Sequence, residues 1–140
     1  MRLSTKAQYA VRALVSLHLH ADGAPTTLKD ISRREDISLT YLEQLFVKLR
    51  RAGIVDSVRG PGGGYVLARP AERIRVDEII ESVEESLVPL SCMEEDGSCR
   101  CTSKCVTQSV WQGLGERIRN FLAAITLEDM TREARGQIGG

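Results

Sequence analysis

All four cysteines of the chain lie between positions 92 and 105, at Cys92, Cys99, Cys101 and Cys105. Thiolates are soft ligands that select zinc, Cu(I) or iron–sulfur clusters. Structural zinc sites usually pair cysteines about two to four residues apart, and only Cys101 and Cys105 fit that pattern. Widely spaced thiolates in a loop that ends at a helix start better suit an iron–sulfur cluster. The cysteine segment therefore predicts a metal site.

Disulfide bonding and enzyme catalysis fit the sequence less well than metal binding does. A disulfide framework would spread cysteines along the chain, although a dithiol redox switch remains an alternative. The two histidines, His18 and His20, fall in the first predicted helix, where we expect ordinary surface or half-buried side chains. No Cys-x-x-Cys motif and no cluster of His, Asp and Ser indicates a nucleophile with its base, so we do not expect an enzyme.

Charge is divided unevenly along a chain of 140 residues whose net charge is zero. Residues 1–75 hold 13 Lys and Arg against 7 Asp and Glu, whereas residues 76–140 hold 6 against 12. A basic half can lie on a polyanion while an acidic half stays away from it. Aromatic residues are only 4 %, which disfavours a base-stacking platform for single strands.

Hydrophobic spacing in the basic half predicts three helices, at 5–21, 28–34 and 39–52. Thr27 and Ser38 are suitable N-cap residues for the second and third helices. Two short helices joined by a turn of about three or four residues are typical of a helix-turn-helix.

Two short strands are predicted next, at 54–58 and 64–68. The segment Arg59-Gly60-Pro61-Gly62-Gly63 joins them, and its glycines permit a tight hairpin. A basic residue on a glycine-rich hairpin directly after a helix-turn-helix indicates a winged helix. The run is not a nucleotide phosphate loop, because it lacks the Gly-Lys-Ser/Thr ending.

The acidic half predicts helices at 76–86, 106–124 and 127–134, the last followed by a glycine-containing tail that we expect to fray. In the long helix, apolar residues step by four, and we expect this stripe to pack on the first helix and on a second subunit. The stripe consists of Val106, Val110, Leu114, Ile118 and Leu122. The predicted fold class is mostly α with a small β-hairpin. We expect residues 1–75 to form a winged helix-turn-helix domain that binds DNA, and residues 76–140 to hold the cysteine loop and a dimerisation helix, packed with the first helix as one compact unit.

No segment is apolar enough to span a membrane, and the N-terminus lacks a signal peptide pattern, so we expect a cytoplasmic protein.

Several stretches resemble the iron–sulfur cluster regulator (IscR) family of bacterial winged-helix transcription regulators. They are MRLSTKAQYAVRAL, ISLTYLEQLFVKLRRAGIVDSVRGPGGGYVLAR, the cysteine loop and VWQGLGERIRNFLAAITLEDM. The resemblance implies a homodimer that binds palindromic, double-stranded promoter DNA, with its recognition helix in the major groove and its wing in the minor groove.

Motif matches to this family place ten candidate DNA-binding residues. Hydroxyl groups can hold phosphates, a glutamine can read an adenine edge, and a glutamate can accept a hydrogen bond from cytosine. An arginine suits a narrow, electronegative minor groove. The candidates are Ser38, Thr40, Tyr41, Glu43, Gln44, Arg59, Gly60, Gly62, Gly63 and Gly64.

The resemblance also implies that Cys92, Cys99 and Cys105 bind a cluster, [2Fe–2S] in this family. The family's histidine ligand is replaced by Gln108, a poor iron ligand, so Cys101 is the expected fourth ligand. Gln108 itself, a partner-subunit residue and a non-protein ligand are the alternatives. The predicted function is a metal-binding transcription regulator, such as a repressor. It senses the iron–sulfur cluster status of the cell, the redox state or nitric oxide through its own cluster. The alternatives are a cluster-free winged-helix regulator that senses a metabolite or thiol redox state, and a zinc-stabilised winged helix.

Overall fold

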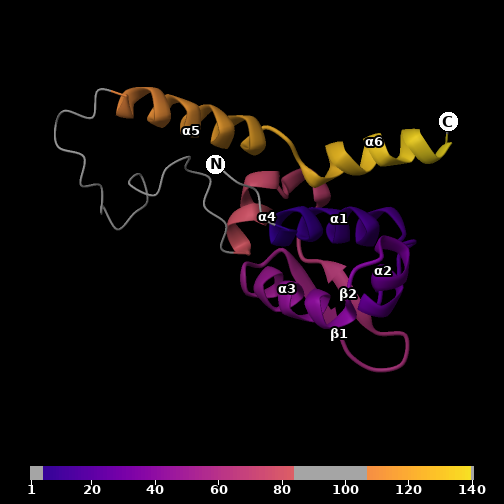
Figure 1. Ribbon diagram of the computed structural model, residues 1–140. Coiled ribbons are helices and arrows are strands. Elements are labelled where there is room, and N and C mark those ends of the chain that lie inside the picture. Colours follow the sequence, from indigo (N-terminus) through magenta and orange to yellow (C-terminus); the bar gives the residue numbers. More distant parts are fainter. Residues whose placement is uncertain (1–4, 84–106, 140) are drawn as a thin grey trace.

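The computed structural model describes residues 5–83 and 107–139 (Figure 1). The four cysteines, Cys92, Cys99, Cys101 and Cys105, lie outside the described residues, as does the start of the predicted 106–124 helix. The architecture is mostly helical with one two-stranded antiparallel sheet, as predicted. No helix within the described ranges is long and apolar enough to cross a membrane.

Three helices build the core of the basic half: α1 (Thr5–Leu19), α2 (Leu28–Glu35) and α3 (Leu39–Arg51). Both predicted N-caps are confirmed. Thr27 Oγ1 accepts a hydrogen bond from the Asp30 N–H at 3.1 Å, and Ser38 Oγ accepts one from the Tyr41 N–H at 3.3 Å. These bonds satisfy backbone donors that the first turn of a helix leaves free. The helices bury one contiguous apolar cluster, which includes Leu14, Ile31, Leu42, Phe46 and Leu49.

The hairpin consists of β1 (Val55–Val58) and β2 (Gly64–Leu67), with Val55 opposite Leu67 and Val58 opposite Gly64. The connection between α1 and α2 adds a second, shorter pairing, an antiparallel bridge between Thr26 and Tyr65. There the Thr26 N–H donates to the Tyr65 carbonyl at 3.0 Å, and the Tyr65 N–H donates to the Thr26 carbonyl at 2.8 Å. The Tyr65 ring also meets the Phe46 ring edge-on at 4.9 Å between centroids. The hairpin is therefore fixed to both α2 and α3.

After β2 the basic half ends with η1 (Ala71–Arg73). The acidic half packs on the body through α4 (Val76–Ser82) and α6 (Leu127–Gly139). At the junction, the Val76 N–H donates to the Ile125 carbonyl at 2.9 Å, and the Leu127 N–H donates to the Ile74 carbonyl at 2.8 Å. Leu127 is fully buried in the main core. These contacts place α6 along α1 (Figure 1).

The long helix α5 (Gln108–Ala123) projects from the body and contacts it mainly through α4 (Figure 1). Only its C-terminal end reaches the start of α1, where Leu122 packs in a small cluster with Ala7, Val76 and Ile80. The expectation that this helix packs along the first helix is therefore wrong for most of its length. The hydrogen bonds at the junction between η1, α4 and α6 place α6, rather than α5, along α1.

Two further boundaries differ from the prediction. The helix at 76 ends at Ser82 with Val83 as its C-cap, rather than at Ser86. The final helix continues past Ala134 to Gly139, where we expected a frayed tail. Gly136 does not stop it, because a glycine inside a helix costs only about 1 kcal/mol relative to alanine and keeps its backbone hydrogen bonds.

Candidate nucleic-acid interface

One face of α3 is exposed and polar. Thr40, Glu43 and Gln44 are all exposed and lie at helical spacing, opposite the buried Leu42, Leu45, Phe46 and Leu49. Within residues 5–83 and 107–139, these three side chains make no hydrogen bond or ion pair. Their donors and acceptors are thus available to a ligand, as a helix that reads base edges requires.

The other two candidates on α3 also support the helix itself. The Ser38 hydroxyl accepts the capping bond from the Tyr41 N–H, so it can offer its hydrogen to an outside acceptor such as a phosphate. Tyr41 is half-buried, and its ring meets Tyr9 of α1 edge-on at 5.7 Å between centroids. The ring contact packs the start of α3 against α1.

The other candidate DNA-binding residues lie in the hairpin. Arg59 is exposed and has no partner among the residues that the structure describes. Gly60 and Gly62 have positive φ angles of 94° and 75°, and the Gly63 N–H donates to the Gly60 carbonyl at 2.9 Å. Gly63 lies in the tight part of the turn, where an added Cβ would meet the carbonyl oxygens of Val58 and Gly60. Gly64 begins β2, where an added Cβ would meet the Thr26 carbonyl oxygen. The glycines shape the loop that presents Arg59.

An ion pair anchors the base of the hairpin. Arg69 Nη1 lies 3.4 Å from Glu78 Oε1 on α4 and donates to the Arg73 carbonyl at 3.2 Å. Burial raises the pKa of Glu78, but the Arg75 N–H and the Arg69 guanidinium outweigh it, so that the pKa is lowered overall. Glu78 stays ionised near neutral pH and holds Arg69 beside β2.

Arginines at the end of α3 were not among the sequence candidates. Arg50 and Arg51 are exposed in the last turn, and neither has a partner within the described ranges. The charge excess of residues 1–75 was the signal that could have found them. They add two exposed cationic side chains to the end of α3.

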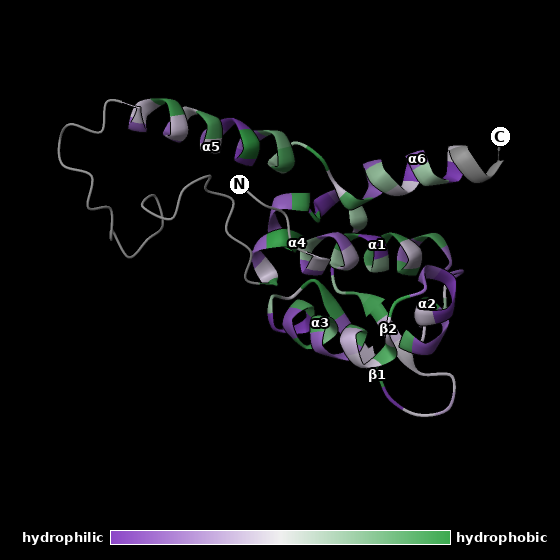
Figure 2. Ribbon diagram, in the orientation of Figure 1, coloured by the Kyte–Doolittle hydropathy of each residue, from purple (hydrophilic) through white to green (hydrophobic). Residues whose placement is uncertain are grey.

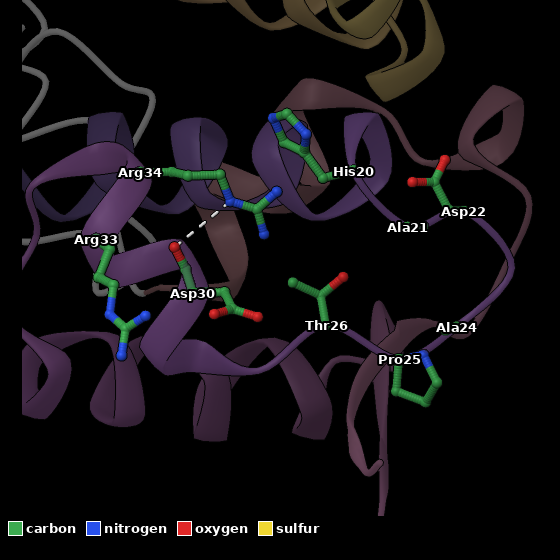
Figure 3. A pocket seen from close by; sticks show the side chains of 9 residues that line it. All are labelled: His20, Ala21, Asp22, Ala24, Pro25, Thr26, Asp30, Arg33 and Arg34. Atoms are coloured by element: carbon green, nitrogen blue, oxygen red, sulfur yellow. Dashed lines mark hydrogen bonds between the residues drawn. The ribbon is translucent and has the colours of Figure 1, made fainter.

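A second charged surface lies at the end of α1. A hollow of about 500 Å³ there is lined by Arg33 and Arg34 of α2, and also by His20, Asp22 and Asp30 (Figure 3). Arg34 Nε donates to the Asp30 carbonyl at 3.4 Å. Acidic and basic groups are mixed here, which makes this hollow less suited to a polyanion than the exposed end of α3.

The metal prediction falls outside what the structure describes. Among residues 5–83 and 107–139, no three His, Cys, Asp or Glu side chains gather as a metal site would require. His18 contacts Glu128 instead, with 2.6 Å between Nε2 and Oε2. Gln108, at the position of the family's histidine, begins α5.

Known proteins share this arrangement. A family model described as "Rrf2: Iron-dependent Transcriptional regulator" matches residues 3–133. The HTH-type transcriptional regulator IscR of Xenorhabdus nematophila is 48 % identical over 132 residues, which cover 94 % of this chain and 80 % of that protein. Among solved structures, T. potens IscR has a TM-score of 0.77 at 40 % identity, covering 96 % of this chain and 88 % of that one. CymR, the global cysteine regulator of B. subtilis, has a TM-score of 0.80 at 31 % identity, covering 95 % and 98 %.

The fold and its exposed helix define a winged helix-turn-helix DNA-binding protein. The chain belongs to the Rrf2 family of transcriptional regulators. Its relatives are regulators rather than enzymes, in agreement with the absence of a nucleophile–base pair from the sequence.

Proposed function

We propose that the protein is a cytoplasmic homodimer that binds palindromic promoter DNA and adjusts this binding through a cysteine-ligated iron–sulfur cluster. The observation that carries the proposal is the exposed face of α3. There Thr40, Glu43 and Gln44, which have no partner among the described residues, lie opposite the helix's buried side. In this proposal α3 enters the major groove of the DNA. The hairpin loop, with Arg59 and the glycines from Gly60 to Gly64, contacts the DNA backbone and reaches into the minor groove. Ser38 and Tyr41 then hold phosphates with their hydroxyl groups.

The exposed side of α5 supports the dimer. Val110, Leu114 and Phe121 are 60 %, 42 % and 65 % exposed, and their spacing of four and seven residues puts them on one side of the helix. Figure 2 shows hydrophobic residues along this projecting helix. An apolar side that residues 5–83 and 107–139 leave uncovered is the surface that a second copy would bury. In this proposal residues 1–75 contact DNA, and residues 76–140 hold the cluster and the partner.

The donor set suits an iron–sulfur cluster. Cys92, Cys99, Cys101 and Cys105 offer four soft thiolates, the number that [2Fe–2S] and [4Fe–4S] clusters require. When bound, such a cluster supplies a centre that changes with redox state or nitric oxide. The cysteines lie in sequence between α4, which supports the hairpin, and α5, which we assign to the dimer. Cluster binding can therefore favour one spacing between the two α3 helices of the dimer. The coupling free energy between cluster binding and DNA binding would then be about 1–3 kcal/mol.

Binding to DNA tests the first half of the proposal. We expect the protein to enrich a palindromic sequence from a random double-stranded library. Gln44→Ala should lose about 1–3 kcal/mol of discrimination at one base of each half-site. Arg59→Ala should weaken binding to all sequences and reduce the salt dependence. Gln8→Ala, on the exposed side of α1, is the matched control and should bind as the wild type does. Failure to enrich any sequence would refute the proposal.

Anaerobic purification tests the second half. About two iron and two sulfide per chain indicate a [2Fe–2S] cluster, and Cys92→Ser should abolish its visible spectrum. Apo and holo protein should then differ in affinity for the enriched DNA. A protein that stays colourless after cluster reconstitution contradicts the cluster and favours regulation by a metabolite or thiol redox state. Equal apo and holo affinities for every sequence contradict the sensing role.

A further inference from the structure

Val47 is an exposed apolar residue on the recognition helix. Its side chain is 46 % exposed, although the other large apolar side chains in the middle of α3 are buried. It follows Thr40 by seven residues, Glu43 by four and Gln44 by three, so it lies in the same row as these polar candidates. We name Thr40, Glu43, Gln44 and Val47 the reading row. Val47 belongs to the exposed face of α3 and not to the core.

The surroundings of Val47 are basic. A hollow of about 370 Å³ beside it is lined by Arg50 and Arg51 of α3 and by Tyr65 of β2. Neither arginine has a partner within residues 5–83 and 107–139. These guanidinium groups favour phosphates next to Val47, as on a DNA backbone that flanks the groove. Charge thus indicates that nucleic acid, rather than an apolar protein surface, covers this valine.

The chemistry of the base edges indicates which base Val47 can contact favourably. In the major groove, bases present hydrogen-bond donors and acceptors, and the thymine C5-methyl is the apolar group among them. A valine side chain can bond to none of the polar groups and would exclude water from them at a cost. Valine is also stiff in a helix, because one χ1 rotamer dominates, so little side-chain entropy is lost on contact.

We propose that Val47 determines specificity by packing on the C5-methyl group of a thymine in each half-site. The inference rests on the proposed entry of α3 into the major groove. Three helical residues rise about 4.5 Å and one base-pair step about 3.4 Å, so this thymine lies about one step beyond the base that Gln44 reads.

Deoxyuridine substitution tests this contact, because deoxyuridine differs from thymidine only by the missing C5-methyl. Full-length wild type and Val47→Ala are each used to select double-stranded DNA from a random library. Each thymine of the enriched site is then replaced in turn by deoxyuridine, in both half-sites together. Wild type should lose about fourfold in affinity per half-site at one symmetric position and nothing comparable at the other thymines. Val47→Ala should show the weaker affinity already with thymine, no further loss with deoxyuridine, and a relaxed preference at that position.

Leu39→Ala is the matched control, since Leu39 is exposed on α3 at 39 % but lies outside the reading row. It should keep the thymine preference and the deoxyuridine effect. A common melting temperature and unchanged affinity for random DNA show that each variant is folded. Equal deoxyuridine losses in wild type and Val47→Ala, or none in either, would overturn the role of Val47 while leaving the proposed function intact. Enrichment of no sequence by the wild type would instead overturn the proposed function and this inference together.

Discussion

Gly64 shows how one residue fixes the hairpin. Its φ angle is 153°, and a Cβ at this position would lie 2.5 Å from the carbonyl oxygen of Thr26. That oxygen accepts the 2.8 Å hydrogen bond from the Tyr65 N–H that ties the hairpin to the start of α2. A glycine is therefore required by the close approach of another chain segment as well as by the turn.

We expect Gly64→Ala to lower the free energy of unfolding by about 1–3 kcal/mol more than Gly62→Ala does. Both glycines have positive φ, but a Cβ at Gly62 meets nothing within 4 Å, so Gly62→Ala reports the backbone strain alone. Urea denaturation of the two variants measures the difference. Equal losses would show that the contact with Thr26 adds no constraint.

Glu128 is the second residue with a measurable consequence. Its side chain is only 14 % exposed and lies 2.6 Å from His18 Nε2 and 3.1 Å from Arg135 Nη1. The hydrogen bond from His18 lowers the pKa of Glu128 most, and burial, which raises it, is outweighed with the help of Arg135. A carboxyl whose pKa is lowered in the folded state stabilises the fold above its ordinary pKa, and this stabilisation is lost as pH falls through the folded pKa.

Glu128→Gln should therefore be less stable than wild type at pH 7, and the difference should shrink below about pH 4. Urea denaturation at several pH values measures it. Glu133→Gln, on an exposed part of the same helix, controls for the loss of one negative charge and should give a smaller and flatter difference. A constant difference for Glu128→Gln down to the acid range would contradict the assignment.

At the scale of elements, reciprocal capping starts α6. The Thr126 N–H donates to Asp129 Oδ2 at 3.0 Å, and the Asp129 N–H donates to Thr126 Oγ1 at 3.1 Å. This is a capping box, and it encloses the buried Leu127 that anchors the helix on α1. The Thr126-x-x-Asp129 spacing is thus a local signal for the start of the helix that was predicted at 127–134.

Thr126→Ala should cost about 1 kcal/mol of stability, the usual loss on removal of an N-cap hydroxyl. Thr126→Ser keeps the hydroxyl and should stay close to wild type. Thermal or urea denaturation followed by circular dichroism compares the three proteins. Equal stability of the alanine and serine variants would show that the hydroxyl bond is not what starts α6.

At the scale of the whole molecule, α5 is the element that the described chain leaves uncovered. Leu114 and Phe121 have no place in either apolar cluster of the body. Burying a large apolar side chain contributes about 1.5–3 kcal/mol, and a two-fold dimer buries each side chain twice. The proposed dimer therefore depends strongly on these residues.

Leu114→Glu and Phe121→Glu should each raise the dimer dissociation constant at least about tenfold, because a charge would be buried in the interface. Analytical ultracentrifugation over a range of concentrations measures this constant. Gln112→Glu adds the same charge on another side of α5 and should change it little. If all three variants behave alike, the apolar side of α5 is not the interface.

Local signals in the sequence determined most of the fold of residues 5–83. Apolar periodicity, the caps Thr27 and Ser38, and the glycines of the hairpin act over a few residues, so α1, α2, α3 and both strands lie close to their predicted positions. The family's motifs pointed to the exposed residues Thr40, Glu43, Gln44 and Arg59 for a related reason. These four candidates fall within residues 40–59, a stretch short enough for local motifs to cover.

Only the tertiary structure decided which helix covers α1. Periodicity shows that α5 and α6 each have an apolar side, but it does not say what each side meets. The hydrogen bonds that join Ile74 and Val76 to Leu127 and Ile125 link segments about 50 residues apart, and they place α6 on α1 while α5 projects. The approach of Thr26 to Gly64 is likewise a long-range contact. Such contacts depend on the summed packing of the whole chain, which no local pattern contains.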